Sequence, residues 1–296
     1  MTRLNNAEPT IAAALRAAAD RLAAARVDTP RLDAEVLLRH VLGLDRAALF
    51  ARLHDALERI DAAAFGDLIE RRLTGEPVAY LTGEREFMGL PFIVDSAVLV
   101  PRPETELLVE WALGWLATRP AATVLDVGTG SGAIALGLAA HLFANWRGAI
   151  VATDVSAGAL AVAAANRARL GLARRVPLVR GDLATWCRGP VDLLLANLPY
   201  LRPDQVAANP DLRAEPALAL VGGADGLVLV RRLVADAPRL LAPGGALGLE
   251  IDPSQADAVR ALIAASLPDA AIEVRPDLAG LARHVVARDA AIRTRS

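Results

Sequence analysis

The pattern of apolar and polar positions divides the chain into a helical first part and a second part in which strands and helices alternate. From Thr10 to about Thr74, apolar residues recur at the 3.6-residue period of amphipathic helices, as in IAAALRAAADRLAAA. Pro30 is a favourable first residue of a helix, and Gly43 is a favourable end. This part therefore predicts a small helical bundle.

The pattern changes after this bundle. The stretch EFMGLPFIVDSAVLV holds short apolar runs separated by Gly89, Pro91 and Asp95, which predicts a β-hairpin between two domains. A helix is expected over PRPETELLVEWALGWLA. We predict a helical domain over residues 1–78, a hairpin linker over 79–100 and a catalytic domain over 101–296.

Strands and helices alternate regularly after Thr123. The expected strands are TVLDV, AIVATD, VPLVRGD, DLLLAN, ALGLEI, AIEVRP and HVVARD, mostly separated by helical patterns. Apolar strands that alternate with helices are typical of an α/β fold whose parallel sheet is covered on both faces. Such sheets bind their ligands at the carboxyl ends of the strands.

Composition narrows the class of protein. Hydrophobic residues make up 54% of the 296 residues and charged residues 22%, which is typical of a globular protein. The formal net charge of -2 does not favour a duplex-binding protein with a basic face. With one cysteine, no long apolar run and no metal-ligand spacing among the histidines, we expect a cytoplasmic protein without a metal site.

The stretch VLDVGTGSGAIAL places Gly128, Gly130 and Gly132 between a predicted strand and a predicted helix. Glycines let the backbone turn sharply and let a ligand lie against the peptide units, since no Cβ intervenes. Asp154 ends the next strand, where a carboxylate can accept both hydroxyls of a ribose. Asp182 ends the third strand and can accept from an adenine amino group. These residues predict a nucleoside-containing cofactor and do not separate NAD from S-adenosylmethionine.

Asn197, Leu198, Pro199 and Tyr200 follow the fourth strand, on the same edge of the predicted sheet. A planar amide or aromatic amine is a poor nucleophile because its lone pair is delocalised. The Asn197 side-chain oxygen and the Leu198 carbonyl can accept both of its N–H bonds and stabilise positive charge during methyl transfer. Pro199 restricts the loop, and Tyr200 offers a flat face for stacking. For an isolated tetrapeptide, the favoured interpretation would be a strand end followed by a Pro turn and a packed tyrosine.

Together with the glycine turn, this loop resembles that of the class I S-adenosylmethionine methyltransferases that modify amino groups on planar systems. Within that group the chain resembles the release-factor glutamine methyltransferases nearly end to end. The resemblance is carried by GEPVAYLTGEREFMGLPFIVDSAVLVPRPETELLVEWAL, DVGTGSGAIAL, TDVSAGALAVAAANRARLG, RAEPALALVGGADGL, LLAPGGALGLEI and AGLARHVVAR. It implies an N-terminal helical substrate-docking domain, a hairpin and a seven-stranded Rossmann-like catalytic domain.

The resemblance also implies methyl transfer to the amide nitrogen of the glutamine in the Gly-Gly-Gln motif of peptide chain release factors, without stable binding to nucleic acid or membrane. Asn197, Leu198, Pro199 and Tyr200 would hold that amide. RPETE at 102–106 is a family motif beside the pocket. The implied cofactor residues are Gly128, Thr129, Gly130, Ser131, Gly132, Asp154, Asp182, Leu183 and Asn197.

Two positions depart from the family pattern. Leu198 replaces the first proline of the usual Asn-Pro-Pro-Tyr loop, which removes a φ constraint and predicts a looser loop. Leu183 stands where some relatives carry Trp, which predicts weaker stacking on adenine.

Four alternatives stay open. The rRNA adenine dimethyltransferases share Asn-Leu-Pro-Tyr, but they typically carry Glu-x-Gly-x-Gly where this chain has Asp126-Val127-Gly128-Thr129-Gly130. A DNA adenine methyltransferase would need a target-recognition insertion. An NAD-dependent oxidoreductase would explain the glycine turn alone. A binding module without turnover would retain the cofactor pocket.

Overall fold

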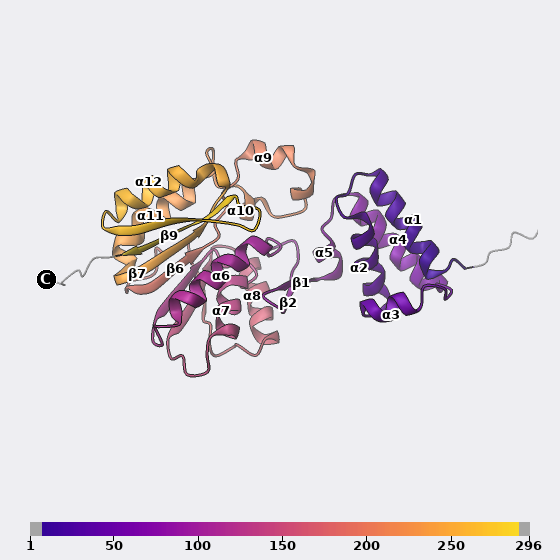
Figure 1. Cartoon of the computed structure of the whole chain (residues 1–296), viewed down its shortest axis with the longest axis horizontal. Coiled ribbons are helices and arrows are strands. Elements are labelled where there is room, and N and C mark those ends of the chain that lie inside the picture. The colour runs from indigo at the N-terminus through magenta and orange to yellow at the C-terminus, as the bar shows by residue number, and fades with distance from the viewer. Residues whose placement is uncertain (1–7, 290–296) are drawn as a thin grey trace, which may run out of the picture. The chain divides into compact units, whose positions relative to one another are not determined.

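The computed structural model describes residues 8–289. The chain folds into two compact units, residues 1–83 and 84–296, and each is described by itself. Both are drawn in Figure 1. Within residues 8–289, no helix combines the length and the apolar character that crossing a membrane requires.

The first unit is the helical bundle that the periodicity predicts. Its helices are α1 (Ile11–Ala24), α2 (Pro30–Leu42), α3 (Arg46–Ala51), α4 (Arg59–Leu73) and α5 (Val78–Thr82). Thr10 and Asp45 cap α1 and α3 by accepting from the backbone N–H groups of Ala13 and Ala48. The apolar faces of these helices form one core, which includes Ile11, Leu22, Leu37, Leu38, Leu49, Phe65 and Ile69.

The second unit begins with a two-stranded antiparallel hairpin, β1 (Glu84–Phe87) and β2 (Leu90–Ile93). Phe87 and Phe92 are buried in the core of this unit, with their rings edge to face at 5.8 Å. Asn166, which is fully buried, accepts from the Ile93 N–H over 2.6 Å and donates to the Ile93 carbonyl over 2.9 Å. The hairpin is thus packed onto the second unit and shares its core.

A seven-stranded sheet forms the centre of the second unit. Its order is β5-β4-β3-β6-β7-β9-β8. The strands are β3 (Thr123–Val127), β4 (Ala149–Asp154), β5 (Leu178–Arg180), β6 (Val191–Ala196), β7 (Leu241–Glu250), β8 (Ala270–Pro276) and β9 (Ala282–Asp289). The helices are α6 (Pro103–Leu116), α7 (Ala133–His141), α8 (Ala157–Arg169), α9 (Pro203–Ala208), α10 (Ala217–Leu220), α11 (Val228–Leu240) and α12 (Ala256–Ser266).

The parallel sheet expected from the sequence is confirmed with one exception. Neighbouring strands from β5 through β7 pair in parallel, but β9 is antiparallel to both β7 and β8. The reason is the short connection between β8 and β9, since only antiparallel neighbours can be joined by a tight turn.

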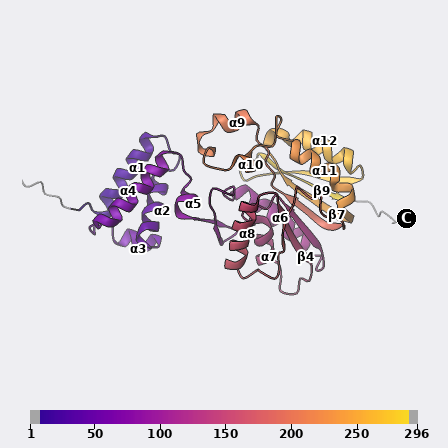
Figure 2. The ribbon, with the colours of Figure 1, turned by 180° about the vertical axis from the view of Figure 1, so that it is seen from behind.

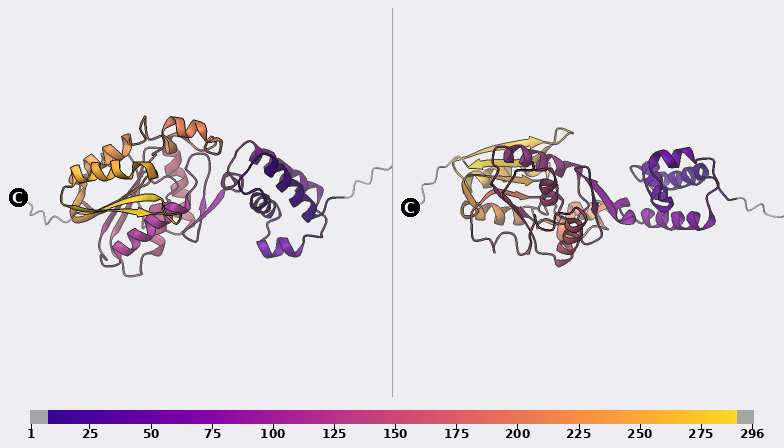
Figure 3. Two further views of the ribbon diagram at one scale, coloured as in Figure 1. Left: turned by 45° about the horizontal axis from the view of Figure 1, so that its top comes forward. Right: turned by 90° about the horizontal axis from the view of Figure 1, so that it is seen from below.

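Helices cover both faces of this sheet. Alternate strand residues point to opposite faces. Val124, Leu193 and Leu195 pack with α6 and α7, whereas Leu125, Leu194 and Leu247 pack with α11 and α12. Figure 1 and Figure 2 show α6 and α7 on one side of the strands and α11 and α12 on the other, and Figure 3 shows the same layers by colour. Because helices cover both faces of the sheet, a ligand-binding site is expected at the ends of the strands.

Candidate active site

The glycine turn between β3 and α7 is held by buried hydrogen bonds. Gly128, Gly130 and Gly132 all have positive φ (75°, 56° and 86°), which side chains other than glycine rarely adopt. The N–H groups of Gly128 and Thr129 both donate to the Thr153 carbonyl over 2.9 Å. The turn is therefore fixed against the end of β4.

Asp126 stabilises the glycine turn through hydrogen bonds within the core. It is fully buried, and its Oδ2 accepts from the Thr129 hydroxyl over 2.6 Å and from the Ala135 N–H over 3.2 Å. Burial raises the pKa of Asp126 to about 7, against the opposing effect of these hydrogen bonds. Asp126 thus orders the turn and the start of α7 from within the core.

A cavity of about 530 Å³ lies at the carboxyl ends of β3, β4, β5 and β6. It brings together all but two of the site residues expected from the sequence. The expected residues that line it are Gly128, Thr129, Gly130, Ser131, Asp154, Asp182, Leu183, Asn197, Leu198 and Pro199. The exceptions are Gly132, which is the N-cap of α7, and Tyr200.

Asp154 lies at the mouth of the turn, with its carboxylate anchored on both oxygens. Oδ2 accepts from the Gly130 N–H over 2.9 Å, and Oδ1 accepts from the Ser156 N–H over 2.8 Å. Each carboxylate oxygen has a second lone pair. Because the side chain also lines the cavity, those lone pairs fit a ribose with two hydroxyls.

The residues expected near the adenine differ in their surroundings. Asp182 lines the cavity, and its Oδ2 accepts from Arg232 over 2.6 Å, which leaves Oδ1 and the second lone pair of Oδ2 for a ligand. Leu183 has a φ of 49° and is 9% exposed. A positive φ is uncommon for leucine and marks a backbone that its neighbours hold in place. Leu183 thus lines the cavity without an aromatic ring, so the weaker stacking on adenine stays a prediction.

The loop after β6 is anchored by Leu198. Its side chain is 3% exposed, and a Cβ built on Gly128 would lie 2.9 Å from Leu198 Cδ2. The glycine at 128 therefore leaves the room that Leu198 fills. This packing of the leucine side chain opposes the looser loop that we expected from the loss of a proline, and the looser loop stays a prediction.

Tyr200 has a different environment from the one expected. It does not line the cavity, and its hydroxyl donates to Glu250 Oε1 over 3.3 Å. Burial raises the pKa of the Tyr200 hydroxyl, so the group stays protonated and acts as a donor. The stacking role of Tyr200 stays a prediction, whereas its hydrogen bond to β7 is a feature of the structure.

Several residues at or near the cavity had no individual role assigned from the sequence, although residues 102–106 were expected beside the pocket. Thr105 and Arg102 line the cavity, and Arg102 forms an ion pair with the buried Glu215, which also accepts from the Val100 N–H. Glu250 is the last residue of β7 and is 1% exposed. A signal for Glu250 was present, because it ends a buried strand at the same edge of the sheet as Asp154 and Asn197.

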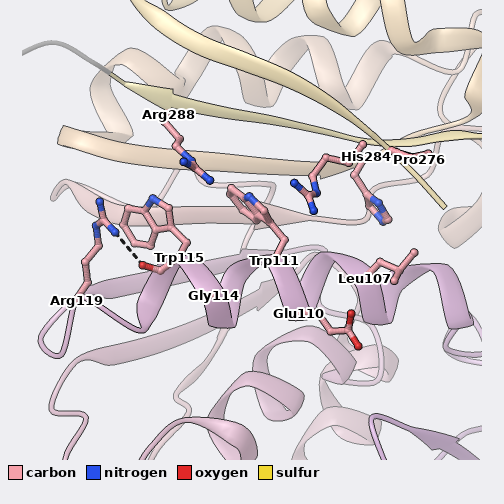
Figure 4. A pocket seen from close by; sticks show the side chains of 10 residues that line it. Leu107, Glu110, Trp111, Gly114, Trp115, Arg119, Pro276, His284 and Arg288 are labelled. Atoms are coloured by element: carbon pink, nitrogen blue, oxygen red, sulfur yellow. Dashed lines mark hydrogen bonds between the residues drawn. The ribbon is translucent and has the colours of Figure 1, made fainter. Parts of the chain in front are cut away.

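A second cavity, of about 480 Å³, lies between α6 and the strands β8 and β9 (Figure 4). Trp111, Trp115 and Arg288 contribute to its walls, and none of the expected site residues lines it. Within residues 8–289, no group of three His, Cys, Asp or Glu side chains is arranged to hold a metal ion. The site residues expected from the sequence therefore gather at the first cavity.

The strand order, with one reversed strand beside the edge, and a glycine turn at the cavity define the class I methyltransferases. Family models agree: "PrmC N-terminal domain" matches residues 13–83, and "Methyltransferase domain" matches residues 124–211. A methyltransferase from Pyrococcus furiosus has a similar fold, with a TM-score of 0.50 and 20% identity over 69% of this chain and 90% of its own.

Relatives with higher sequence identity identify the family to which the chain belongs. The chain is 47% identical to the release factor glutamine methyltransferase of Moorella thermoacetica, over 92% of this chain and 95% of that protein. It is also 47% identical to the release factor glutamine methyltransferase of Bordetella pertussis, over 86% of this chain and 93% of that protein. The chain belongs to the release factor glutamine methyltransferase family, and its methyl donor is S-adenosylmethionine.

Proposed function

We propose that this chain transfers a methyl group from S-adenosylmethionine to the side-chain amide nitrogen of the glutamine in the Gly-Gly-Gln motif of peptide chain release factors. The observation that carries the proposal is the position of Asn197, whose side chain lines the same cavity as the glycine turn. An amide held by Asn197 lies in the cavity that the glycine turn borders. The names of the relatives support release factors over rRNA as the substrate.

The residues around the turn fit the methyl donor. Gly128–Gly132, Asp154, Asp182 and Leu183 would hold S-adenosylmethionine, which supplies an electrophilic methyl group on a sulfonium sulfur. The free lone pairs of Asp154 suit its ribose hydroxyls, and the glycines leave space beside the backbone.

The loop at 197–200 would act on the substrate amide. Asn197 Oδ1 and the Leu198 carbonyl accept its two N–H bonds and hold the nitrogen in the cavity. Both oxygens also stabilise the positive charge that develops on nitrogen as the carbon–nitrogen bond forms, and one amide proton is then released to water. Orientation by fixed groups supplies much of the rate in such a transfer.

We also propose that residues 1–78 dock the release factor, residues 79–100 link the domains and residues 101–296 perform the transfer. The match of residues 13–83 to the N-terminal family model supports a dedicated role for the helical unit. Since release factors act in translation, the proposal places the chain in the cytoplasm, without stable binding to nucleic acid.

Mass spectrometry of a release factor tests this function. The purified factor is incubated with the protein and isotopically labelled S-adenosylmethionine, then digested. We expect one labelled methyl group on the glutamine of the Gly-Gly-Gln peptide. A release factor with glutamate in place of that glutamine is the control and should stay unlabelled. Label on rRNA or DNA, with none on this glutamine, would contradict the proposal.

A further inference from the structure

A chain of hydrogen bonds runs from Asn197, at the wall of the cavity, to Glu250 in the core. Asn197 Nδ2 donates to Thr105 Oγ1 over 3.0 Å, and Thr105 Oγ1 donates to Glu250 Oε2 over 2.6 Å. Tyr200 donates to the other oxygen of the same carboxylate over 3.3 Å. Thr105 and Glu250 are 4% and 1% exposed, so the hydrogen bond between them is shielded from water. Residues from α6, β7 and the loop after β6 thus meet behind the amide of Asn197.

The hydrogen-bond inventory of these groups determines which way the Asn197 amide faces. The two ends of a carboxamide have nearly the same shape, so the partners of the amide decide its orientation. An ionised carboxylate only accepts, and a threonine hydroxyl has a single hydrogen. Because that hydrogen goes to Glu250, the Thr105 oxygen can only accept from Asn197. The Asn197 NH₂ group therefore faces Thr105, and Oδ1 is left for the cavity.

We propose that Thr105 and Glu250 are positioning residues that orient the Asn197 amide, so that the cavity presents an oxygen to the substrate and selects the amide nitrogen. This proposal rests on the proposed function. If Asn197 were reversed, its NH₂ group would face the cavity and would bind the substrate's carbonyl oxygen. The substrate nitrogen would then be held away from the methyl donor. Glu250 thus sets, through Thr105, which atom of the glutamine is held for reaction.

The groups around Glu250 set its pKa, and therefore the pH range in which it orients the Asn197 amide. Burial raises the pKa of Glu250 to about 7, opposed by the hydrogen bond from Thr105 and the charge of Arg283, while Glu104 raises it further. His284 Nε2 lies 3.9 Å from Glu250 Oε2, and burial lowers the pKa of His284 to about 4, so this ring is neutral. Above pH 7 the carboxylate is ionised and only accepts. Below pH 7 it gains a proton that it can donate to Thr105, which frees the Thr105 hydrogen to turn toward Asn197.

A matched pair of variants at Thr105 tests the proposal at pH 8. Thr105→Val keeps the shape of the side chain but removes the hydroxyl, and Thr105→Ser keeps the hydroxyl. We expect Thr105→Val to lower kcat about 10–100-fold, since the loss of an orienting hydrogen bond misplaces the substrate nitrogen. The affinity for S-adenosylhomocysteine, measured by calorimetry, should be little changed. Thr105→Ser should retain most of the wild-type kcat.

Two further comparisons separate orientation from packing. The double variant Thr105→Val/Glu250→Gln should have a kcat only slightly below that of either single variant, because both changes act through the Asn197 amide. The ratio of wild-type kcat to Thr105→Val kcat should shrink between pH 8 and pH 6, as Glu250 becomes protonated. Asp126, whose pKa is also raised to about 7, is unchanged in both proteins, so its titration cancels in that ratio.

The outcomes distinguish this proposal from the proposed function. A wild-type protein that leaves the Gly-Gly-Gln glutamine unmodified contradicts the function itself. If the wild type methylates it and a folded Thr105→Val variant turns over at the wild-type rate, the function stands and the positioning role is overturned. Loss of activity in Thr105→Ser as large as in Thr105→Val, additive losses in the double variant, or a ratio that is constant with pH would also overturn it.

Discussion

Replacing Asn197 with alanine is expected to lower kcat for the release factor by about 10²–10³-fold, the loss typical of removing one fixed group that stabilises developing charge. The variant loses the oxygen that accepts a substrate N–H and stabilises charge on the nitrogen. It keeps the glycine turn and Asp154, the residues proposed to hold the methyl donor. Its affinity for S-adenosylhomocysteine should therefore stay close to that of the wild type.

Asp154→Ala is the matched contrast to Asn197→Ala. Asp154 contacts the glycine turn through the Gly130 N–H, so its removal should weaken binding of S-adenosylhomocysteine. Calorimetry and single-turnover kinetics on both variants separate the two roles. An Asn197→Ala variant that retains wild-type turnover would remove Asn197 from its proposed role.

The second large effect is expected at Gly226, which packs against the backbone of the 197–200 loop. A Cβ there would lie 2.1 Å from the Tyr200 carbonyl oxygen and 2.5 Å from Gln255 Nε2, and that nitrogen donates to the same carbonyl over 2.9 Å. Gly226→Ala must therefore displace the loop. We expect a loss of about 2–4 kcal/mol in the free energy of unfolding, from overpacking together with the left-handed backbone. The kcat should fall as well, because the loop carries Asn197.

Gly244→Ala is the control for Gly226→Ala. Gly244 has the same φ of 75°, but a Cβ there meets no described atom within 4 Å. Gly244→Ala should lower the free energy of unfolding only by the cost of a left-handed backbone, about 1–2 kcal/mol. Its activity should be unchanged. Thermal unfolding measures the stability of both variants. In a unit of this size, each kcal/mol lost from the free energy of unfolding lowers the melting temperature by roughly 2–4 °C. Equal shifts in melting temperature, with full activity in Gly226→Ala, would show that this contact does not hold the loop.

Much of the fold follows from local patterns that the sequence displays directly. Apolar runs indicated the strands, and Pro30 and Gly43 marked the bounds of a helix that the structure confirms. Asp154 and Asn197 were expected at the site because Asp154 ends a buried strand and Asn197 follows one, at the edge where such sheets bind ligands, and both line the cavity. The antiparallel β9 was missed, since a run of apolar residues carries no information on strand direction.

Contacts between distant residues could not be predicted in this way. Thr105 and Glu250 are 145 positions apart, and neither periodicity nor motif spacing links them. The direction of Tyr200 was likewise beyond local reasoning, because it depends on a carboxylate at the end of β7. For Leu198, the sequence showed the loss of a proline but not the space beside Gly128 that its side chain fills.

The most direct test of the central claim is a crystal structure of the protein with S-adenosylhomocysteine and a Gly-Gly-Gln peptide. The claim is that two oxygens at the rim of the sheet hold the substrate amide. We expect the glutamine nitrogen at hydrogen-bond distance from both Asn197 Oδ1 and the Leu198 carbonyl oxygen, in the cavity bordered by the glycine turn. A glutamine whose nitrogen binds other groups, away from these two oxygens, would contradict the claim.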